Sequence, residues 1–394
     1  MSLPLDGVRV VEYAQYVAGP LCGVLLADLG ADVVKVEPPA GDGYRFVMPV
    51  APGLGRYFVP LNRGKRSVVV DLKTDGGLAT SSRLLASADV VLHNFPRKRA
   101  EQFELGWDRV HATYPKVVVG RVTSFGTNGP LADAPAYDLI AQARAGLLTA
   151  HASRGDAVPV RAGGTPMADL TAGFLLASGV LAALLDARET GDGQLVDVSL
   201  LAAAMAVQLQ DLVWLAGEGD DVPSGADRAH LDARADEITG GVAMNPYYRC
   251  FEASDGFVAV ACLNLAQRMA FLALFGLDDP TVSAPDVVPD DAAVLAAKER
   301  LTGRIVEVFA QQPVAAWIDR LAAAGVPCGP VQRREGVHMD PQVVSEGLVG
   351  EIDQDGLGVV RLLAPFVRVG GATGDVASAP ALGEHTAAVL GELG

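Results

Sequence analysis

The chain has 394 residues, of which half are apolar and a fifth are charged, and aromatic residues are few. This length and composition indicate a globular protein with a large core and two domains, built from small aliphatic side chains in α/β layers. The formal net charge of −16 argues against general binding to nucleic acid or to an anionic membrane.

The charge is unevenly distributed along the chain. Residues 1–120 hold 14 Lys/Arg and 12 Asp/Glu, whereas the remaining 274 residues hold 17 and 35. Because a polyanion is attracted to the least negative region, the first 120 residues are the favoured host of any polyanionic ligand.

Cysteine and histidine usage indicates neither disulfides nor a metal site. The four cysteines are far apart without CxxC spacing, and the six histidines form no HExxH or HxxxH pattern. The start of the chain lacks the basic and apolar regions of a secretory signal. The apolar run over 168–185 is interrupted by Asp169 and glycines, which is typical of a buried core helix and not of a membrane span. We therefore expect a cytoplasmic protein with no bound metal.

The first elements in chain order form a strand–helix–strand unit. Residues 8–13 are predicted as a strand, residues 21–29 as a helix with Pro20 at its start, and residues 32–36 as a second strand. A right-handed crossover makes the two strands parallel. GxGxxG is absent, so a dinucleotide site is not supported, but the turn at 17–19 can present backbone N–H groups to a ligand.

The alternation continues through the first half of the chain. Strands are predicted over 67–72, 89–93, 117–122 and 195–200, and helices over 76–86, 173–187 and 201–215. This order predicts an α/β fold with a Rossmann-like open parallel sheet.

A second, smaller α+β domain is predicted after this sheet. Residues 217–241 are polar and acidic and are interpreted as a linker, followed by a hairpin around Glu252–Gly256 and then helices. Residues 324–331 are expected to return the chain toward the first region, and residues 383–393 form a helical tail. The predicted domains are 1–216 (large domain), 217–325 (linker and small domain) and 326–394 (return to the large domain).

Asp169 is the strongest catalytic candidate. It lies where a Gly/Pro loop becomes a long apolar helix, so the free N–H groups and the positive end of the helix dipole are expected to lower its pKa. A carboxylate in such a position can act as a nucleophile toward an activated carbonyl. The alternative is that Asp169 only caps or complements the charge of the helix.

Two basic clusters lie at strand ends. Residues 62–73 contain Arg63, Lys65 and Arg66 at a loop before a strand, and residues 93–99 place Arg97, Lys98 and Arg99 directly after one. In an open α/β sheet, ligands bind beyond the carboxyl ends of the strands. Both clusters suit phosphate binding, and the alternatives are a solvated basic loop for the first and a charged helix start for the second.

Two further glycine-containing stretches are candidates for a substrate-binding segment and for a lid. In residues 124–142, glycines permit close approach of a ligand, and Tyr137 and Asp138 can reach a substrate; the alternative is a turn followed by a helix N-cap. Gly240 and Gly241, after the acidic stretch, suit a mobile lid or equally the plain end of a linker.

Taken together, these segments resemble the class III CoA-transferases, the family of the formyl-CoA and crotonobetainyl/carnitine CoA-transferases. The resemblance spans nearly the whole chain. It is carried by 5–10, 18–20, 29–37, 62–72, Asn94-Phe95, 136–138, Asp169, 191–199, 325–331 and 382–386. Asp169 matches the nucleophile of that family.

The resemblance implies an interlocked homodimer that acts on an acyl-CoA and a small carboxylic acid. It also implies a set of CoA-binding residues. Arg97 and Lys98 are added to this set because of their charge and their position in the sequence. The expected CoA-binding residues are Val17, Ala18, Val70, Asp71, Leu72, Lys73, Asn94, Phe95, Pro96, Arg97, Lys98, Ala134, Pro135, Ala136 and Tyr137. The expected substrate or lid residues are Gln15, Tyr137, Asp138, Gly240 and Gly241.

The reaction that the resemblance implies is CoA transfer by covalent catalysis, with CoA or acyl-CoA as substrate and no permanently bound cofactor. Asp169 attacks the thioester, an aspartyl-CoA thioester forms through a mixed anhydride, and an acceptor carboxylate then takes over the CoA. Val17 and the short Gly240-Gly241 pair depart from the formyl-CoA transferase pattern and argue against formate/oxalate exchange. Gln102 and Pro38 stand where several relatives carry CoA-binding arginines.

Two other functions compete with transfer. An α-methylacyl-CoA racemase shares the fold, but it uses a His-Asp pair where this chain has Tyr137-Asp138, so one of the two proton-transfer groups is missing. A non-catalytic acyl-CoA-binding protein is the other alternative, and the intact Asp169 argues against it.

Overall fold

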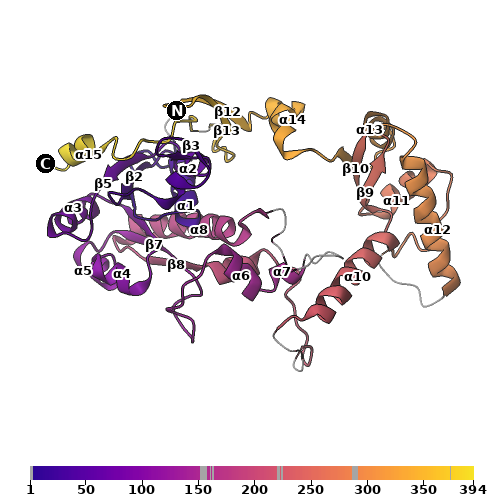
Figure 1. The fold of residues 1–394 in the computed structure, drawn as a ribbon, viewed down its shortest axis with the longest axis horizontal. Helices are drawn as coiled ribbons and strands as arrows, with labels where there is room; N and C mark the ends of the chain where they lie inside the picture. Colours follow the sequence, from indigo (N-terminus) through magenta and orange to yellow (C-terminus); the bar gives the residue numbers. More distant parts are fainter. Residues whose placement is uncertain are drawn as a thin grey trace. The chain divides into compact units, whose positions relative to one another are not determined.

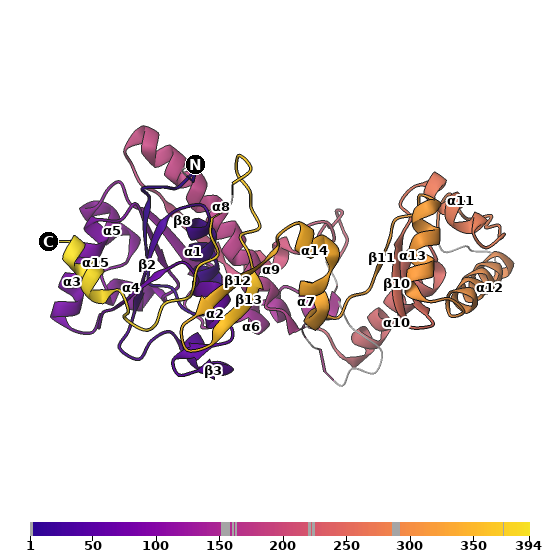
Figure 2. The same ribbon diagram turned by 90° about the horizontal axis from the view of Figure 1, so that it is seen from above.

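The computed structural model describes residues 3–150, 158–159, 161, 164–219, 222, 225–285, 292–372 and 374–394. The chain forms two compact units (Figures 1 and 2). The first combines residues 1–150, 160–222 and 341–394, and the second combines residues 151–159 and 223–340. The domain boundaries expected at 216 and 325 remain a prediction.

A six-stranded parallel sheet forms the centre of the first unit, as the sequence predicts. Its order is β5 (Arg66–Val69), β2 (Asp32–Glu37), β1 (Arg9–Glu12), β6 (Val90–His93), β7 (Val118–Thr123) and β8 (Leu195–Ser199). From β1 the chain proceeds to β2 on one side, whereas β6 lies on the other side. The strand order therefore reverses between β1 and β6, and α/β folds bind ligands beyond the carboxyl ends of the strands at this point.

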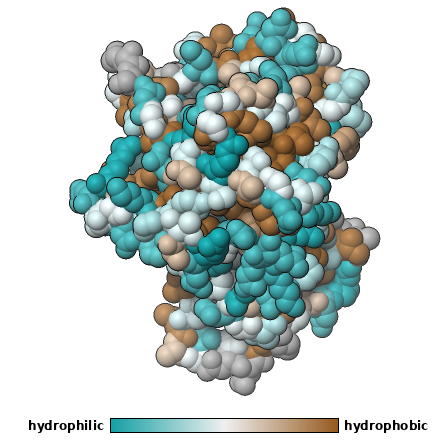
Figure 3. All heavy atoms as spheres, turned by 90° about the vertical axis from the view of Figure 1, so that its left-hand side faces the viewer, coloured by the Kyte–Doolittle hydropathy of each residue, from teal (hydrophilic) through white to brown (hydrophobic). Residues whose placement is uncertain are grey.

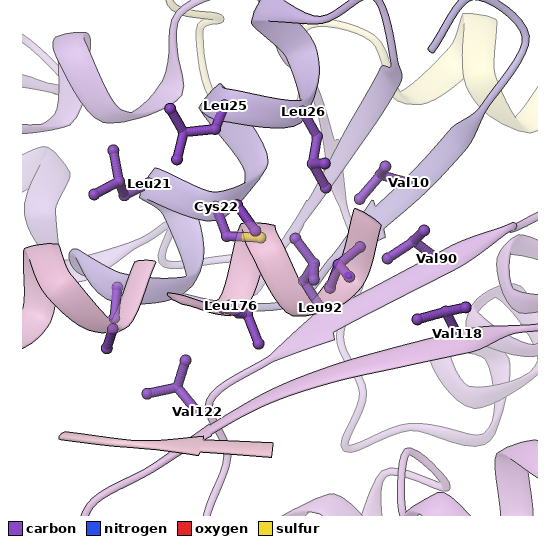
Figure 4. Close-up of a cluster of buried hydrophobic side chains, with 14 of the residues drawn as sticks. Val10, Leu21, Cys22, Leu25, Leu26, Val90, Leu92, Val118, Val122 and Leu176 are labelled. Carbon is purple, nitrogen blue, oxygen red and sulfur yellow. The ribbon is translucent and has the colours of Figure 1, made fainter. Parts of the chain in front are cut away.

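Helices cover both faces of the sheet because successive strand residues point to opposite sides. Val10 and Leu92 face α1 (Ala18–Asp28) and α8 (Met167–Thr190), as the cluster in Figure 4 shows. Val11 and Val91 face the opposite core. That core includes residues of α3 (Asp75–Ala86), α5 (Trp107–Thr113) and α15 (Thr386–Glu392).

Helix α8 is long and apolar enough to cross a membrane by length and composition. Its contacts instead make it a core helix, because Leu176 and Val180 are fully buried in the cluster that joins α1 to the sheet. Gly173 permits this contact: a Cβ there would lie 2.8 Å from the Leu21 side chain and 2.9 Å from the carbonyl oxygen of Ala18. The absence of a side chain at one position thus brings the start of α8 close to the start of α1.

The C-terminal segment completes the first unit. A hairpin of β12 (Val349–Gln354) and β13 (Gly358–Leu363) shares a small core with α2 (Phe58–Asn62), in which Phe58 is fully buried. Arg66 of β5 forms an ion pair with Glu392 of α15 at 2.6 Å. Hydrophilic residues are interspersed with hydrophobic ones on the face seen from the side of α3 and α15 (Figure 3).

The second unit contains an antiparallel sheet with helices around it. The predicted hairpin is confirmed as β9 (Tyr248–Ala253) and β10 (Gly256–Ala261), and β11 (Cys328–Pro330) pairs with β10. Its core is aromatic: Phe309 of α12 (Ala292–Phe309) stacks on Phe251 and on Trp317 of α13 (Val314–Ala323), each at 4.2 Å between ring centroids. Such stacked rings add specific contacts to the burial of apolar area.

Two predictions for the middle of the chain are wrong. The helix expected over 201–215 ends early, as α9 (Leu200–Ala206). The expected linker over 217–241 is helical from Arg228 onward, as α10 (Arg228–Met244). Alanine and arginine are strong helix formers, and Ala235 is buried. A polar composition was therefore an insufficient reason to expect a linker.

Candidate active site

An open pocket lies beyond the carboxyl ends of β1, β6 and β7, at the point where the strand order reverses. Its cavity volume is about 370 Å³. The lining comes from residues 15–18 after β1, 94–97 and 99 after β6, 121–124 and 126–127 from β7 onward, 132–137 before α6 (Asp138–Arg144), and Asp169 and Leu200. Asp169 is the only carboxylate of α8 in this lining, among the described residues.

The loop after β1 is held in place by side chains from two directions. The amide of Asn94 accepts a hydrogen bond from the Gln15 N–H (3.1 Å) and donates one to the Gln15 carbonyl (2.8 Å). Tyr16 has a φ of 70° and donates its N–H to Asp42 at 3.3 Å. Asp42 is itself paired with the buried Lys35 at 2.9 Å. This support fixes a loop conformation that a tyrosine adopts only at an energetic cost.

Asp169 lies in the first turn of α8, as the sequence predicts, but the residue that caps this helix comes from elsewhere. Pro166 at the N-cap position provides no capping hydrogen bond. Instead, Oδ1 of Asp138, at the start of α6, accepts from the N–H of Ala168 (2.9 Å) and from the N–H of Asp169 (3.3 Å). A carboxylate thus satisfies two of the free N–H groups at the helix start.

The expectation of a low pKa for Asp169 is wrong. Burial, and next the neighbouring Asp138 carboxylate, raise the pKa of Asp169 to about 7, while Arg161 acts in the opposite direction. The sequence argument considered the helix dipole but not a second carboxylate brought in by another helix. A buried carboxyl beside a like charge is harder to ionise, and strongly shifted groups of this kind are concentrated at functional sites.

Tyr16 and Tyr137 line the pocket together with Asp169. Tyr16 contacts Tyr44 and Tyr137 edge-to-face, with ring centroids 5.5 and 6.1 Å apart. Burial, and next the Asp169 charge, raise the pKa of Tyr44, so its hydroxyl lies within electrostatic reach of Asp169. The rings provide an apolar wall with polar edges on the side of Asp169.

Cations lie in the part of the pocket that follows β6. Arg97, the first residue of α4 (Arg97–Gln102), donates to the Thr127 carbonyl at 3.1 Å and is exposed. Arg99 also lines the pocket, whereas Lys98 does not. Arg121 lines it too, in an ion pair with Asp197 at 2.9 Å. The guanidinium groups of Arg97 and Arg99 suit the recognition of phosphate groups.

The predicted site residues divide into four groups. Lys98 and Asp138 adjoin lining residues in the sequence but do not themselves line the pocket. Those that line the pocket together with Gln15 and Asp169 are Val17, Ala18, Asn94, Phe95, Pro96, Arg97, Ala134, Pro135, Ala136 and Tyr137. Those that follow the edge strand β5, outside this lining, are Val70, Asp71, Leu72 and Lys73. Gly240 and Gly241 lie in α10 of the second unit, so their role as a lid remains a prediction.

The first basic cluster has a structural role. Lys65 is buried and donates to Glu12 at 2.8 Å. Arg63 forms a buried pair with Asp28, with one N–O distance of 2.7 Å, and Arg66 pairs with Asp32 of β2. These cations hold the sheet and its neighbouring segments together by charge-assisted hydrogen bonds. For Arg63, Lys65 and Arg66 the structure thus supports neither a solvated loop nor a phosphate site, whereas the CoA contact expected at Lys73 remains a prediction.

Sequence reasoning missed three arginines near the site: Arg99 as a lining residue, Arg121 and Arg161. Arg99 had a signal, since it belongs to the basic run. Arg161 had none, because no recognisable motif includes it in the sequence and it approaches Asp138 only through folding, at 3.3 Å.

Comparisons with known proteins agree with this architecture. The model of CoA-transferase family III matches residues 5–386. Succinate–glutarate CoA-transferase of Agrobacterium fabrum is 33% identical, over 99% of this chain and 96% of the relative. Acetyl-CoA:oxalate CoA-transferase of Acetobacter aceti is 31% identical, over 83% of this chain and 80% of the relative. The crystal structure of a CaiB/BaiF family protein from Brucella suis superimposes with a TM-score of 0.80 at 31% identity, and all of both chains is covered.

Proposed function

The chain belongs to CoA-transferase family III, and we propose that it moves CoA from a donor acyl-CoA to an acceptor carboxylic acid through an aspartyl-CoA thioester on Asp169. The observation that carries this proposal is the position of Asp169. Its carboxyl lines the pocket that contains the exposed Arg97 and Arg99, on a backbone fixed by Asp138.

The pocket suits CoA by its chemistry. Arg97 and Arg99 are proposed to meet the phosphate groups, which are the strongest anions of CoA. Helix α1 begins in the pocket lining, with Val17 at its N-cap position and Ala18 as its first residue. Because Val17 has no side chain that can cap the helix, the free backbone N–H groups and the helix dipole favour an anionic group there. Residues 132–137 also line the pocket, and apart from Asp133 they carry no charge, which suits an uncharged pantetheine chain.

The proposed reaction proceeds by two exchanges at Asp169. An oxygen of its carboxylate attacks the donor thioester carbonyl, the C–S bond breaks, and a mixed anhydride forms with release of CoA thiolate. The thiolate attacks Cγ of Asp169 and displaces the donor acid, which leaves with the bridging oxygen. The acceptor carboxylate then attacks Cγ and displaces the thiolate, and the thiolate finally attacks the acceptor carbonyl and frees Asp169.

The ionisation of Asp169 fits this role. The nucleophile is the carboxylate, and a pKa of about 7 leaves a large fraction of it ionised at neutral pH. A carboxylate destabilised by burial and by Asp138 has more to gain from losing its charge when it is acylated. The neighbouring charges thus favour the covalent intermediate over the free carboxylate.

We further propose that the active protein is an interlocked homodimer located in the cytoplasm, as the family resemblance implies. Light scattering combined with size-exclusion chromatography tests the dimer, since a monomeric mass with full activity would contradict it.

Racemisation is a second candidate because a carboxyl with a pKa of about 7 is also a suitable proton-transfer group. A racemase needs a second group that acts on the opposite face of the α-carbon. In the described part of the lining no histidine is present, and Asp138 already accepts four hydrogen bonds. Deuterium from solvent entering the α-position of an acyl-CoA without any acceptor acid would favour the racemase.

Trapping with hydroxylamine tests the proposed transfer. After incubation with succinyl-CoA or another acyl-CoA and hydroxylamine, mass spectrometry of the peptide that contains Asp169 should show a hydroxamate at this residue. Asp169→Asn provides the control. An unmodified Asp169 in a protein that catalyses transfer would refute the covalent proposal.

A further inference from the structure

Arg161 is a cation near the site that the proposed reaction leaves without a role. Its Nη1 lies 3.3 Å from Oδ2 of Asp138, and its side chain is 37% exposed. Asp138 itself is buried and fully engaged: Oδ2 also accepts from Gln142 at 2.7 Å, and Oδ1 accepts from the N–H groups of Ala168 and Asp169. One carboxylate thus ties Arg161 to the first turn of α8, where Asp169 lies.

The charges of this cluster change during catalysis. In the free enzyme, Arg161 forms an ion pair with Asp138, and its charge also acts on Asp169, where it opposes the rise in pKa caused by burial and by Asp138. When Asp169 becomes an anhydride or a thioester, its negative charge disappears. Among the residues that the structure describes, Asp138 is then the counter-charge that Arg161 keeps, and the cluster can accept one further anion.

We propose that Arg161 binds the reacting carboxylate of the acceptor acid, and by reversal that of the departing donor acid. This inference rests on the proposed transfer function. An attacking oxygen must come within about 3–3.5 Å of the electrophilic carbon, here Cγ of Asp169. Arg161 is held beside the same helix turn and is partly exposed, and a guanidinium binds a carboxylate in a defined, bidentate geometry.

The exchange of charges gives the reaction an order. Before acylation, an incoming carboxylate meets the combined negative charge of Asp138 and Asp169. After acylation, it takes the position beside Arg161 that the Asp169 charge has vacated. When the thiolate attacks the acceptor carbonyl, the electron pair of the breaking C–O bond returns to Asp169, and Arg161 again faces its own two carboxylates. The acid is therefore bound tightly only by the covalent enzyme.

The test compares Arg161→Gln and Arg161→Lys with Arg144→Gln, a control that removes an exposed cation from the far end of α6. The first step, acylation of Asp169 before the donor acid departs, is followed as hydroxamate on Asp169, at pH 9 so that Asp169 is ionised. The second is followed as the KM for acceptor acids, with matched mono- and dicarboxylic acids. Arg161→Gln should leave the first rate within about threefold and raise the acceptor KM roughly 10- to 100-fold for both kinds of acid, the range of a charged hydrogen bond. The acceptor KM of Arg161→Lys should lie between those of the wild-type protein and Arg161→Gln.

Each other outcome contradicts the inference. An unchanged acceptor KM would show that Arg161 does not bind the acid, and a loss confined to dicarboxylic acids would show that it binds the distal carboxylate instead. If Arg161→Gln does not fold, Arg161→Lys keeps a cation beside Asp138 and should still raise the acceptor KM at least severalfold, and no rise would overturn the inference. Failure of the transfer function itself looks different, because then the wild-type protein forms no hydroxamate on Asp169.

Discussion

The carboxylate of Asp138 accepts a hydrogen bond from the backbone N–H of Asp169 at 3.3 Å, and its negative charge raises the pKa of the Asp169 side chain. One residue thus fixes the backbone of the proposed nucleophile and also opposes its ionisation. The two effects have different origins, a local hydrogen bond and a longer-range charge interaction, and substitutions can separate them.

Replacing Asp138 by alanine should destabilise the protein. The change removes the acceptor for two N–H groups of α8 and leaves Gln142 and Arg161 without their carboxylate partner, so a loss of about 1–3 kcal/mol in the free energy of unfolding is expected. Urea denaturation measures it. Asp108→Ala removes an exposed carboxylate from the first turn of α5 and should stay within about 0.5 kcal/mol; equal losses in both variants would contradict the capping role.

The rate of acyl transfer to Asp169 should rise with pH through about 7. Only the carboxylate attacks the thioester, so the rate falls as pH drops below the pKa of Asp169. The charged groups that act on Asp169 are Asp138 and Arg161, with Tyr44 nearby. Asp138→Asn removes the negative charge and should move the midpoint to lower pH, whereas an unchanged midpoint would exclude Asp138 as a cause of the shift.

Asp169→Asn should stabilise the folded protein above neutral pH. The pKa of Asp169 is higher in the folded state than its ordinary value of 3.8, so the folded state binds the extra proton and wild-type stability decreases as pH rises from about 4 to about 7. Asp169→Asn has no ionisable group at this position, so its stability does not decrease in this way. A gain of about 1–2 kcal/mol is expected at pH 8, after allowance for partial solvent exposure. The gain should vanish near pH 4, and a gain that is independent of pH would contradict this explanation.

Gly173→Ala should perturb the site through packing. The added Cβ would approach the Leu21 side chain and the Ala18 carbonyl to within 3 Å, so α1 and α8 must separate, at a cost of about 1–3 kcal/mol. The rate of Asp169 acylation should fall as well, because both helices begin at the pocket. Gly76→Ala in α3 meets no atom within 4 Å and should be neutral or slightly stabilising. A tolerated Gly173→Ala would show that the helix contact can relax.

Arg97→Gln and Arg99→Gln should weaken the binding of CoA substrates selectively. If the two guanidinium groups meet phosphate, the KM for acyl-CoA should rise roughly 10-fold in each variant, whereas the KM for an acyl-pantetheine, which lacks those phosphates, should not change. Arg109→Gln, on the surface beside Glu104 at 3.4 Å, is the control. Equal effects on acyl-CoA and acyl-pantetheine would place the phosphates elsewhere, for example at Lys73.

The sheet and the pocket could be predicted from the sequence because their signals are local. Strands such as 8–13 and 89–93 are short β-branched runs, and each is followed by a glycine or polar loop that forms part of the pocket lining. The position of Asp169 at a helix start was equally visible, since a Gly/Pro loop precedes an apolar run.

What could not be predicted depends on contacts between distant segments. Burial and, next, the charge of Asp138, 31 positions away in the sequence, raise the pKa of Asp169, and the role of Lys65 is set by Glu12, 53 positions away. The helix α10 was missed for another reason: composition suggested a linker, while alanine and arginine propensities favoured a helix.

Oxygen exchange tests the covalent mechanism most directly. With an acceptor acid labelled with ¹⁸O in both carboxylate oxygens, the proposed reaction leaves one acceptor oxygen on Asp169 in each turnover, because the C–O bond that breaks last is the one on the acceptor side of the anhydride. Mass spectrometry of the Asp169 peptide should therefore show ¹⁸O after turnover, and the donor acid released in later turnovers should carry it as well. Transfer that proceeds at full rate with Asp169 free of ¹⁸O would contradict the mechanism.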